Sequence, residues 1–306
     1  MRILITGGAG FIGKHLTKFL LEKEHSITIF DNFSNSTKES INPLIHIGAK
    51  IIEGDITIQD EISNAVKEQD IVIHLAAKIS VSESITNPSK IFQVNIDGTK
   101  NILAACKNNS IKKIIVASSA AVYGESSPNV KLSEKSETNP MSPYGESKLK
   151  MEQEIKKFEL KNDINYVILR FFNIYGSGQS KEYAGVISKF IERTRQDKPL
   201  EIFGDGLQTR DFVSIKDVIS SIHKAISFDK NGTFNIASGR IVTIKELAEM
   251  VLFISGKELE IKYTKSKNED IVHSQSDIDL AKINLKYYPK MELKEGIKEL
   301  QRKGFD

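Results

Sequence analysis

The chain begins with MRILITGGAGFIG (residues 1–13), a short apolar run followed by a glycine-rich turn. The apolar run predicts a buried strand, and the residues after the turn predict a helix over 11–23. A glycine turn between a strand and a helix is typical of dinucleotide-binding proteins. In that arrangement Gly7 permits the tight turn, Gly10 lets the backbone approach a pyrophosphate, and Gly13 allows the helix to pack against the strand.

Short apolar runs alternate with amphipathic stretches through the first half of the chain. We expect strands at residues 2–6, 26–30, 50–53, 71–75, 113–117 and 165–170. We expect helices between them at residues 11–23, 59–67, 89–108 and 143–160. Continuous Ile, Val and Leu runs suit strands that are buried on both faces. The alternation therefore predicts an α/β fold with a doubly wound parallel sheet, the Rossmann fold.

The alternation weakens after Arg170, where glycine-containing loops separate shorter elements. Further helices are expected at residues 183–195, 215–227, 243–255 and 293–303. We expect a Rossmann domain at residues 1–172 and a smaller α/β substrate-binding region at residues 173–306. Some elements of the second region are expected to pack back on the first, because no long Pro-, Gly- or Ser-rich linker separates them.

The composition is that of an ordinary soluble globular protein, with 40% hydrophobic and 27% charged residues in a chain of 306. A net charge of +3 does not suggest nucleic-acid binding. No apolar stretch approaches the roughly 20 residues that cross a bilayer, and the first strand begins too early for a signal peptide. One cysteine, Cys106, and six scattered histidines offer neither a disulfide nor a metal-ligand spacing. We expect a cytoplasmic protein without a metal and without a membrane partner.

Two acidic residues close predicted strands. Asp31 ends the second strand, where a carboxylate can accept hydrogen bonds from both hydroxyls of the adenosine ribose. A carboxylate there would repel a 2′-phosphate, which favours NAD over NADP; a solvated acid is the alternative. Asp55 ends the third strand and is expected either to contact the adenine edge or to cap the next helix.

Tyr144 and Lys148 are four residues apart at the start of a predicted helix, so their side chains share one face. A phenol has a pKa of about 10, and a neighbouring ammonium group lowers it. The tyrosinate could then take the proton of a substrate hydroxyl while hydride leaves the same carbon; an exposed helix pair is the alternative. Ser119, preferred over Ser118, ends the fifth strand and is expected to orient the substrate oxygen, unless both serines only satisfy backbone groups of the turn.

Several further blocks of sequence belong with these residues. They are DNFSNS (31–36), HLAA (74–77), NIDGT (95–99), SAAVYG (119–124), YGESK (144–148), RFFNIYG (170–176), FGDG (203–206) and TRDFV (209–213). With these blocks the chain resembles the extended short-chain dehydrogenases/reductases, and among them the nucleotide-sugar 4-epimerases, over nearly its whole length. The resemblance implies bound NAD, a UDP-hexose substrate such as UDP-glucose or UDP-galactose, and a homodimer formed through the helices at 89–108 and 143–160.

The resemblance also implies roles for individual residues. The catalytic residues would be Ser119, Tyr144 and Lys148. The cofactor-binding residues would be Gly7, Gly10, Phe11, Ile12, Gly13, Asp31, Asn32, Asn35, Ser36, Asp55, Ile56, Leu75, Ala76, Ala77, Asn95, Tyr144, Lys148 and Phe171. The substrate-binding residues would be Ser119, Tyr144, Asn173, Phe203, Arg210, Lys267, Asp270 and Ser274. Of these, Asn173 and Arg210 would hold the diphosphate and Phe203 would line the base pocket.

Three positions narrow the expected reaction. Dehydratases and decarboxylases of this superfamily carry an acid beside the catalytic hydroxyl, where this chain has Ala120 and Ala121. Methyl groups cannot exchange protons, so simple oxidation and return of hydride at C4 is the expected chemistry. Ser274 stands at the family position that makes room for an N-acetyl group, so UDP-GlcNAc and UDP-GalNAc are also candidate substrates.

Other readings of the sequence stay open. Lys267 replaces an arginine of the family pattern, which keeps the charge but loses the bidentate fork. An epimerase or oxidoreductase that acts on a different nucleotide sugar is one alternative. A non-catalytic, NAD-sensing scaffold is another, because Rossmann folds serve many roles.

Overall fold

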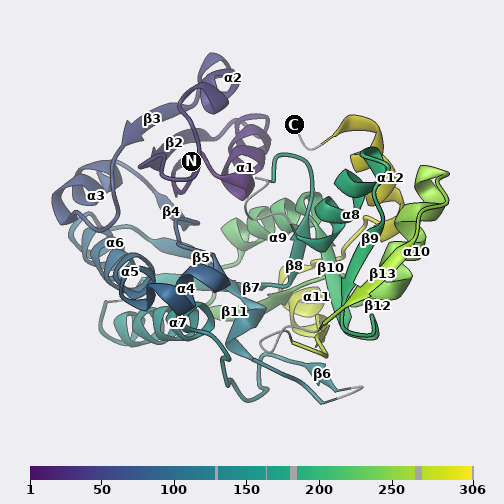
Figure 1. Ribbon diagram of the computed structural model, residues 1–306. Coiled ribbons are helices and arrows are strands. Elements are labelled where there is room, and N and C mark those ends of the chain that lie inside the picture. The colour runs from purple at the N-terminus through teal and green to yellow at the C-terminus, as the bar shows by residue number, and fades with distance from the viewer. Residues whose placement is uncertain (128–129, 163, 180–184, 266–270, 305–306) are drawn as a thin grey trace. The chain divides into compact units, whose positions relative to one another are not determined.

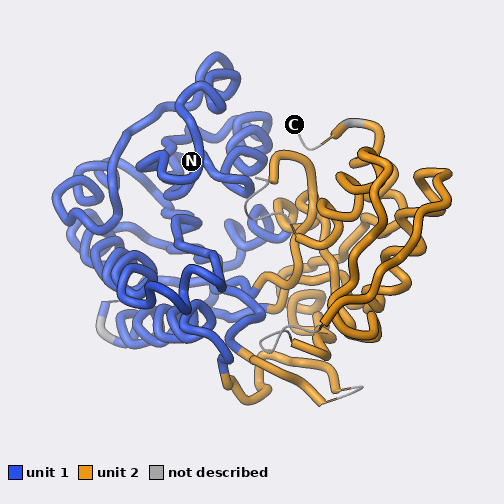
Figure 2. The backbone as a smooth tube through the Cα atoms, viewed as in Figure 1, with its two compact units in different colours: residues 1–122, 140–170, 221–234 blue, residues 123–139, 171–220, 235–306 orange. Residues whose placement is uncertain are grey.

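The computed structural model describes residues 1–127, 130–162, 164–179, 185–265 and 271–304 (Figure 1). The chain forms two compact units, which Figure 2 shows in different colours. Unit 1 contains residues 1–122, 140–170 and 221–234, and unit 2 contains residues 123–139, 171–220 and 235–306. Each unit is therefore assembled from separate stretches of the chain.

A seven-stranded sheet is the main feature of unit 1. From edge to edge it consists of β11 (Gly232–Ile236), β7 (Asn165–Phe171), β5 (Lys113–Ser119), β4 (Ile71–His74), β1 (Arg2–Thr6), β2 (Ser26–Asp31) and β3 (Lys50–Glu53). β1 pairs in parallel with β2 and β4, β2 with β3, and β4 with β5. This order confirms the predicted Rossmann-like fold. The winding direction changes between β1 and β4, where such sheets bind ligands.

The helices that accompany this sheet are α1 (Phe11–Leu21), α2 (Asn42–His46), α3 (Gln59–Val66), α4 (Val81–Thr86), α5 (Pro88–Phe92), α6 (Gly98–Asn108), α7 (Pro143–Asn162) and α9 (Ile215–Ser227). One core cluster joins Val66 of α3, Ile102 of α6 and Met151 of α7. The same cluster contains Leu4 of β1 and Ile114 of β5. Burial of these side chains fixes α7 against the sheet and so places its first turn beside the end of β5.

The single helix predicted at residues 89–108 is wrong in detail. The chain forms α5, then a π-helical turn, η2 (Gln93–Asp97), and then α6. Asn87 ends α4 and caps α5, and its side chain accepts a hydrogen bond of 3.4 Å from the backbone N–H of Lys90. The π-helical turn contains Asn95, which is 1% exposed. Such turns occur frequently at functional sites.

Unit 2 contains short sheets and helices. Its strands are β6 (Lys131–Leu132), β8 (Asn173–Tyr175), β9 (Leu200–Phe203), β10 (Thr209–Ser214), β12 (Ile241–Thr243), β13 (Ile261–Thr264) and β14 (Gln275–Ser276). Its helices are α8 (Val186–Arg195), α10 (Ile244–Ser255), α11 (Asp279–Leu285) and α12 (Leu293–Lys303). β10 pairs in parallel with β8 and antiparallel with β12. A capping box between Thr243 and Glu246 begins α10, and Gly256 ends it in the left-handed conformation.

In residues 1–127, 130–162, 164–179, 185–265 and 271–304, no helix is long and apolar enough to cross a membrane. Among the described side chains, no group of three or more His, Cys, Asp and Glu could hold a metal ion. Burial raises the pKa of Cys106 to about 12, so this thiol stays protonated and unreactive at neutral pH.

Candidate active site

The glycine turn between β1 and α1 has little room for side chains. Gly7 has a positive φ of 71°, and a Cβ atom there would lie 2.6 Å from the backbone nitrogen of Ala76. A Cβ atom on Gly13 would lie 2.5 Å from the Gly7 carbonyl oxygen. On Gly10, a Cβ atom would meet only that oxygen, at 3.2 Å. Gly7 and Gly13 are therefore required by the fold, whereas Gly10 leaves space for a ligand.

The first turn of α1 is suited to an anion. Gly10 is its N-cap and gives no side-chain cap, and no acidic residue lies in the first turn. Phe11 and Ile12 begin the helix, so their backbone N–H groups have no partner within it. The free N–H groups and the helix dipole favour a phosphate. Together with the space at Gly10, this first turn fits the pyrophosphate of NAD.

Asp31 lies at the end of β2, next to the glycine turn. Its Oδ2 accepts a hydrogen bond of 2.9 Å from the backbone N–H of Ala9, and its Oδ1 accepts one of 2.8 Å from that of Phe33. Burial raises the pKa of Asp31, and these two hydrogen bonds oppose the rise. Each carboxylate oxygen has a further lone pair for a ribose hydroxyl. Asp31 therefore shapes the turn, and it remains able to accept from a ribose.

Asp55 follows β3 and does not cap a helix. Ile58 is the N-cap of α3, so the capping alternative for Asp55 is wrong. The Asp55 carboxylate accepts hydrogen bonds from the Thr57 backbone and hydroxyl and, at 2.8 Å, from the Asn32 amide. Partial burial raises the pKa of Asp55, but these hydrogen bonds outweigh burial and leave it below its ordinary value. The hydrogen bond between Asn32 and Asp55 thus connects the loop that follows β2 to the loop that follows β3. Asn35, Ser36 and Ile56 lie in the same two loops.

Ser119, Tyr144 and Lys148 meet where β5 ends and α7 begins. Ser119 is the last residue of β5, Tyr144 is the second residue of α7, and Lys148 follows one turn later. A Cβ atom on Gly145 would lie 2.5 Å from the carbonyl oxygen of Ala121. The glycine after Tyr144 therefore lets the first turn of α7 approach the segment after Ser119.

The protonation of this group depends on burial and on neighbouring charge. Burial raises the pKa of Tyr144, and a hydrogen bond with the Ser119 side chain lowers it. Lys148 is 3% exposed, and its ammonium group donates a hydrogen bond of 2.9 Å to the Ala117 carbonyl oxygen. Burial lowers the pKa of Lys148 to about 8, against the opposite effect of the Glu152 carboxylate. The ammonium group is thus still the main form of Lys148 at neutral pH.

Asn95 supports the site from below. Its side-chain oxygen accepts from the Lys78 backbone N–H at 2.8 Å, and its amide donates to the Lys78 carbonyl and to the Ser147 hydroxyl, each at 2.9 Å. The Ser147 hydroxyl donates in turn to the Tyr144 carbonyl oxygen at 2.7 Å. Asn95 therefore connects the segment after Leu75, Ala76 and Ala77 to the first turn of α7. A direct contact between Asn95 and the cofactor stays a prediction.

His74 was not singled out as a site residue, although it heads the HLAA block. Its Nδ1 lies 2.8 Å from the Thr6 hydroxyl and its Nε2 lies 3.0 Å from the Thr99 hydroxyl. Burial and the Lys148 charge lower the pKa of His74 to about 3, so the imidazole is neutral. His74 therefore ties β1, β4 and α6 together beneath the site without adding a charge.

Apart from Ser119 and Tyr144, the predicted substrate residues that the structure describes lie in unit 2. Asn173 in β8 donates from its amide to the Asp211 carbonyl oxygen at 3.0 Å. Arg210, in the neighbouring strand β10, is half-buried and donates to the Thr209 carbonyl oxygen. The remaining substrate positions are Phe203, which is 38% exposed at the end of β9, and Ser274, which is 7% exposed before β14. Phe171, a predicted cofactor residue, is buried at the end of β7. Lys267 and Asp270 lie outside the described residues.

Known proteins resemble the chain over nearly its whole length. Residues 3–237 match the NAD dependent epimerase/dehydratase family. A putative UDP-glucose 4-epimerase of Methanocaldococcus jannaschii is 40% identical over 302 residues, which are 97% of this chain and 96% of the relative. A UDP-N-acetyl-alpha-D-glucosaminuronate decarboxylase of Bacillus cytotoxicus is 32% identical over 97% of this chain and 96% of that protein.

Solved structures have the same fold. The UDP-glucose 4-epimerase of Thermotoga maritima, with UDP-glucose, gives a TM-score of 0.94 at 32% identity and covers both chains fully. The UDP-N-acetylglucosamine 4-epimerase of Methanobrevibacter ruminantium gives 0.93 at 36% identity, over 98% of this chain and 97% of that one. The UDP-glucuronic acid 4-epimerase of Bacillus cereus, with UDP-glucuronic acid and NAD, gives 0.91 at 33% identity, over 99% and 98%. These similarities confirm the resemblance seen in the sequence: the chain belongs to the NAD-dependent epimerase/dehydratase family, and NAD is its cofactor.

Proposed function

We propose that the protein is an NAD-dependent 4-epimerase of UDP-hexoses, with UDP-glucose and UDP-galactose as its first candidate pair. The observation that carries the proposal is that Ser119 ends β5 beside the first turn of α7, where Tyr144 and the buried Lys148 lie one turn apart. Relatives that act on UDP-glucose, UDP-N-acetylglucosamine and UDP-glucuronic acid support a UDP-sugar substrate. The sugar itself depends on a few positions of the substrate pocket.

In this proposal Tyr144 is the general base. Its phenolate takes the proton of the C4 hydroxyl and later returns it to O4, while the Ser119 hydroxyl holds O4 by a hydrogen bond. The Lys148 ammonium stabilises the phenolate, because an opposite charge nearby lowers a phenol pKa. The chemistry that bound NAD would supply is removal of hydride from C4 and its return to the other face of that carbon, which would leave the reaction redox-neutral overall.

Decarboxylation is a competing activity, because one relative is a UDP-N-acetyl-alpha-D-glucosaminuronate decarboxylase. Ser119 is followed by Ala120 and Ala121, which form a 3-10 turn with Val122 after β5. Neither methyl group can donate or accept a proton beside the catalytic hydroxyl. This sequence favours return of hydride over elimination or decarboxylation.

We propose that residues of the region 173–306 bind the nucleotide sugar. Asn173 and Arg210 lie in paired strands, and Arg210 offers charge-assisted hydrogen bonds to a diphosphate. Phe203 offers an exposed ring for the uracil base. Ser274 is small, so an N-acetyl group on the sugar would be accepted. Comparison of UDP-GalNAc with UDP-galactose tests this last point, and absence of UDP-GalNAc turnover refutes it.

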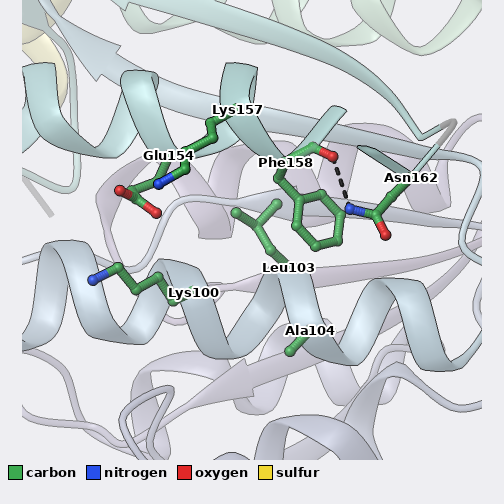
Figure 3. A pocket seen from close by; sticks show the side chains of 7 residues that line it. All are labelled: Lys100, Leu103, Ala104, Glu154, Lys157, Phe158 and Asn162. Carbon is green, nitrogen blue, oxygen red and sulfur yellow. Dashed lines mark hydrogen bonds between the residues drawn. The ribbon is translucent and has the colours of Figure 1, made fainter. Parts of the chain in front are cut away.

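We also propose a homodimer formed by α6 and α7. A groove between these helices is lined by Lys100, Leu103, Ala104, Glu154, Lys157, Phe158 and Asn162 (Figure 3). Leu103 and Phe158 form its apolar floor, and lysine and glutamate side chains stand at its rim. A second copy related by a two-fold axis would offer the same apolar and oppositely charged groups in return. Light scattering at micromolar concentration tests this, and a monomer would refute it.

The proposed reaction is tested by incubating the purified protein with UDP-galactose and following the sugar by proton NMR. Formation of UDP-glucose without accumulation of NADH supports the proposal. Release of carbon dioxide from UDP-glucuronic acid, with UDP-galactose unchanged, would instead assign the chain to the decarboxylases. Binding of NAD without conversion of any UDP-sugar would favour the sensing scaffold.

A further inference from the structure

A buried carboxylate lies one helical turn beyond Lys148. Glu152 of α7 is 0% exposed and accepts hydrogen bonds from Arg170 Nε at 2.9 Å and from Arg170 Nη2 at 2.6 Å. Its Oε1 also accepts a hydrogen bond of 2.6 Å from the Ser118 hydroxyl. Glu152 thus joins α7 to β7 through Arg170 and to β5 through Ser118.

Ser118 has a particular position in β5. The residue before it, Ala117, supplies the carbonyl oxygen that accepts from the Lys148 ammonium group. The residue after it is Ser119, whose side chain lowers the pKa of Tyr144. By holding Ser118, Glu152 therefore fixes the three-residue segment that accepts from Lys148 and carries Ser119.

Several charged or titratable groups face Lys148 and Glu152. Lys148 faces the neutral His74 from β4, the Ala117 carbonyl from β5, and Tyr144 and Glu152 from α7. Glu152 faces Arg170 from β7, the Lys156 ammonium at 3.7 Å and, from β7, Tyr166, whose pKa rises through burial and the charges of Glu159 and Glu152.

Among the described groups, Glu152 is the one whose charge favours the ammonium form of Lys148. A buried ion pair stabilises a fold little compared with apolar side chains of the same volume. The charge of Glu152 is therefore better explained by its effect on the site than by an effect on the stability of the fold.

We propose that Glu152 is a positioning residue that keeps Lys148 protonated and holds Ser118, so that Ser119, Tyr144 and Lys148 stay in their reactive arrangement. The proposal rests on the proposed function, since Tyr144 and Lys148 must be the base and its stabilising cation. Glu152 itself touches neither substrate nor cofactor in this role.

The test is a titration of the Tyr144 phenol in the NAD-loaded protein. The ultraviolet absorbance of tyrosinate is measured against pH, and the signal of the same protein with Tyr144→Phe is subtracted. In Glu152→Gln the ammonium group of Lys148 is less favoured, so the Tyr144 phenol is expected to titrate about one pH unit higher or more. Turnover at neutral pH falls by the corresponding factor of about ten, mainly in kcat rather than in KM.

Two further variants separate this role from a structural one. Glu152→Gln leaves Arg170 buried without its counter-charge, so the triple variant Ser118→Ala, Glu152→Met, Arg170→Met removes all three partners and keeps the space filled. Glu146→Gln is the matched control, because Glu146 also pairs at i, i+4 on α7 but with the exposed Lys150. In the triple variant the Tyr144 phenol is expected to titrate at a higher pH, as in Glu152→Gln. In the control it is expected to titrate at the same pH as in the unchanged protein.

The experiment distinguishes failure of the role proposed for Glu152 from failure of the proposed function. A Tyr144 titration in the folded triple variant that equals that of the unchanged protein overturns the role of Glu152. An upward shift in the triple variant supports it, even if UDP-galactose is not the substrate, because the titration needs only bound NAD. Failure of the unchanged protein to convert any UDP-sugar would count against the proposed function alone.

Discussion

The ammonium group of Lys148 donates a hydrogen bond of 2.9 Å to the carbonyl oxygen of Ala117, which joins α7 to the end of β5. This bond fixes the cation near Tyr144 without neutralising it, because a carbonyl carries no net charge. Lys148→Met removes the cation and leaves an apolar side chain of similar length. We expect the Tyr144 pKa to rise by about one to three units and turnover at neutral pH to fall about ten- to thousand-fold.

Steady-state kinetics of Lys148→Met checks this expectation, with NAD binding measured in parallel by calorimetry. Lys150→Met is the matched control, since Lys150 is exposed on the same helix and pairs with Glu146. Turnover of Lys148→Met within a factor of two of the control would remove the cation from the proposed mechanism.

Tyr144→Phe removes only the hydroxyl group that we propose as the base. We expect NAD binding and the thermal midpoint to stay close to those of the unchanged protein, while turnover falls by about 10²- to 10⁴-fold, the usual contribution of general acid–base catalysis. Calorimetric NAD binding and NMR of the sugar measure the two effects separately. A variant that still converts UDP-galactose at more than a tenth of the original rate would exclude Tyr144 as the base.

In the glycine turn, Gly10→Ala is expected to weaken NAD binding, whereas Gly13→Ala is expected to destabilise the fold. Gly10→Ala places a Cβ atom 3.2 Å from the Gly7 carbonyl oxygen and near no other atom, so the fold should survive. NAD affinity is expected to fall at least about tenfold, because the Cβ would occupy the space that we propose for the pyrophosphate. Gly13→Ala places one 2.5 Å from backbone atoms and should lower the free energy of unfolding by about 1–3 kcal/mol. Gly185→Ala, with no atom within 4 Å, is the control. Equal loss of stability in both variants would contradict this division of roles.

His74 predicts how stability depends on pH. Its pKa is about 3 in the folded protein, against about 6.5 in the unfolded chain. The unfolded state therefore binds more protons between these values. The contribution of neutral His74 to the free energy of unfolding is complete above about pH 6.5 and is lost as the pH falls toward 3. Its size is up to roughly 5 kcal/mol. The free energy of unfolding is measured with urea at several pH values between about 4 and 7. Its slope against pH should be shallower for His74→Gln than for the exposed control His46→Gln. Equal slopes would contradict the prediction.

Much of the fold could be predicted because it depends on local patterns. β1 and β4 are apolar runs between turns, and their burial on both faces is what a parallel sheet requires. The spacing of Tyr144 and Lys148 likewise follows from the helical repeat alone. The π-helical turn at Asn95 could not be predicted, because one extra residue in a turn does not disturb the average helical periodicity.

Contacts between segments that are distant in the sequence could not be predicted either. The pair formed by Glu152 and Arg170 depends on how α7 lies against β7, and neither residue has a local pattern that marks it as buried. The same holds for His74, whose partners Thr6 and Thr99 come from other elements of the chain. Residue type indicated candidate chemistry at these positions, but only the packed structure shows which groups meet.

The most direct test of the central claim uses UDP-galactose that carries deuterium at C4. Oxidation at C4 with return of the same hydride predicts UDP-glucose that retains the deuterium at C4, with no label in solvent and no net NADH. Mass spectrometry and proton NMR of the product measure this retention. Loss of the C4 deuterium to solvent, or its accumulation in free NADH, would contradict a redox-neutral 4-epimerisation.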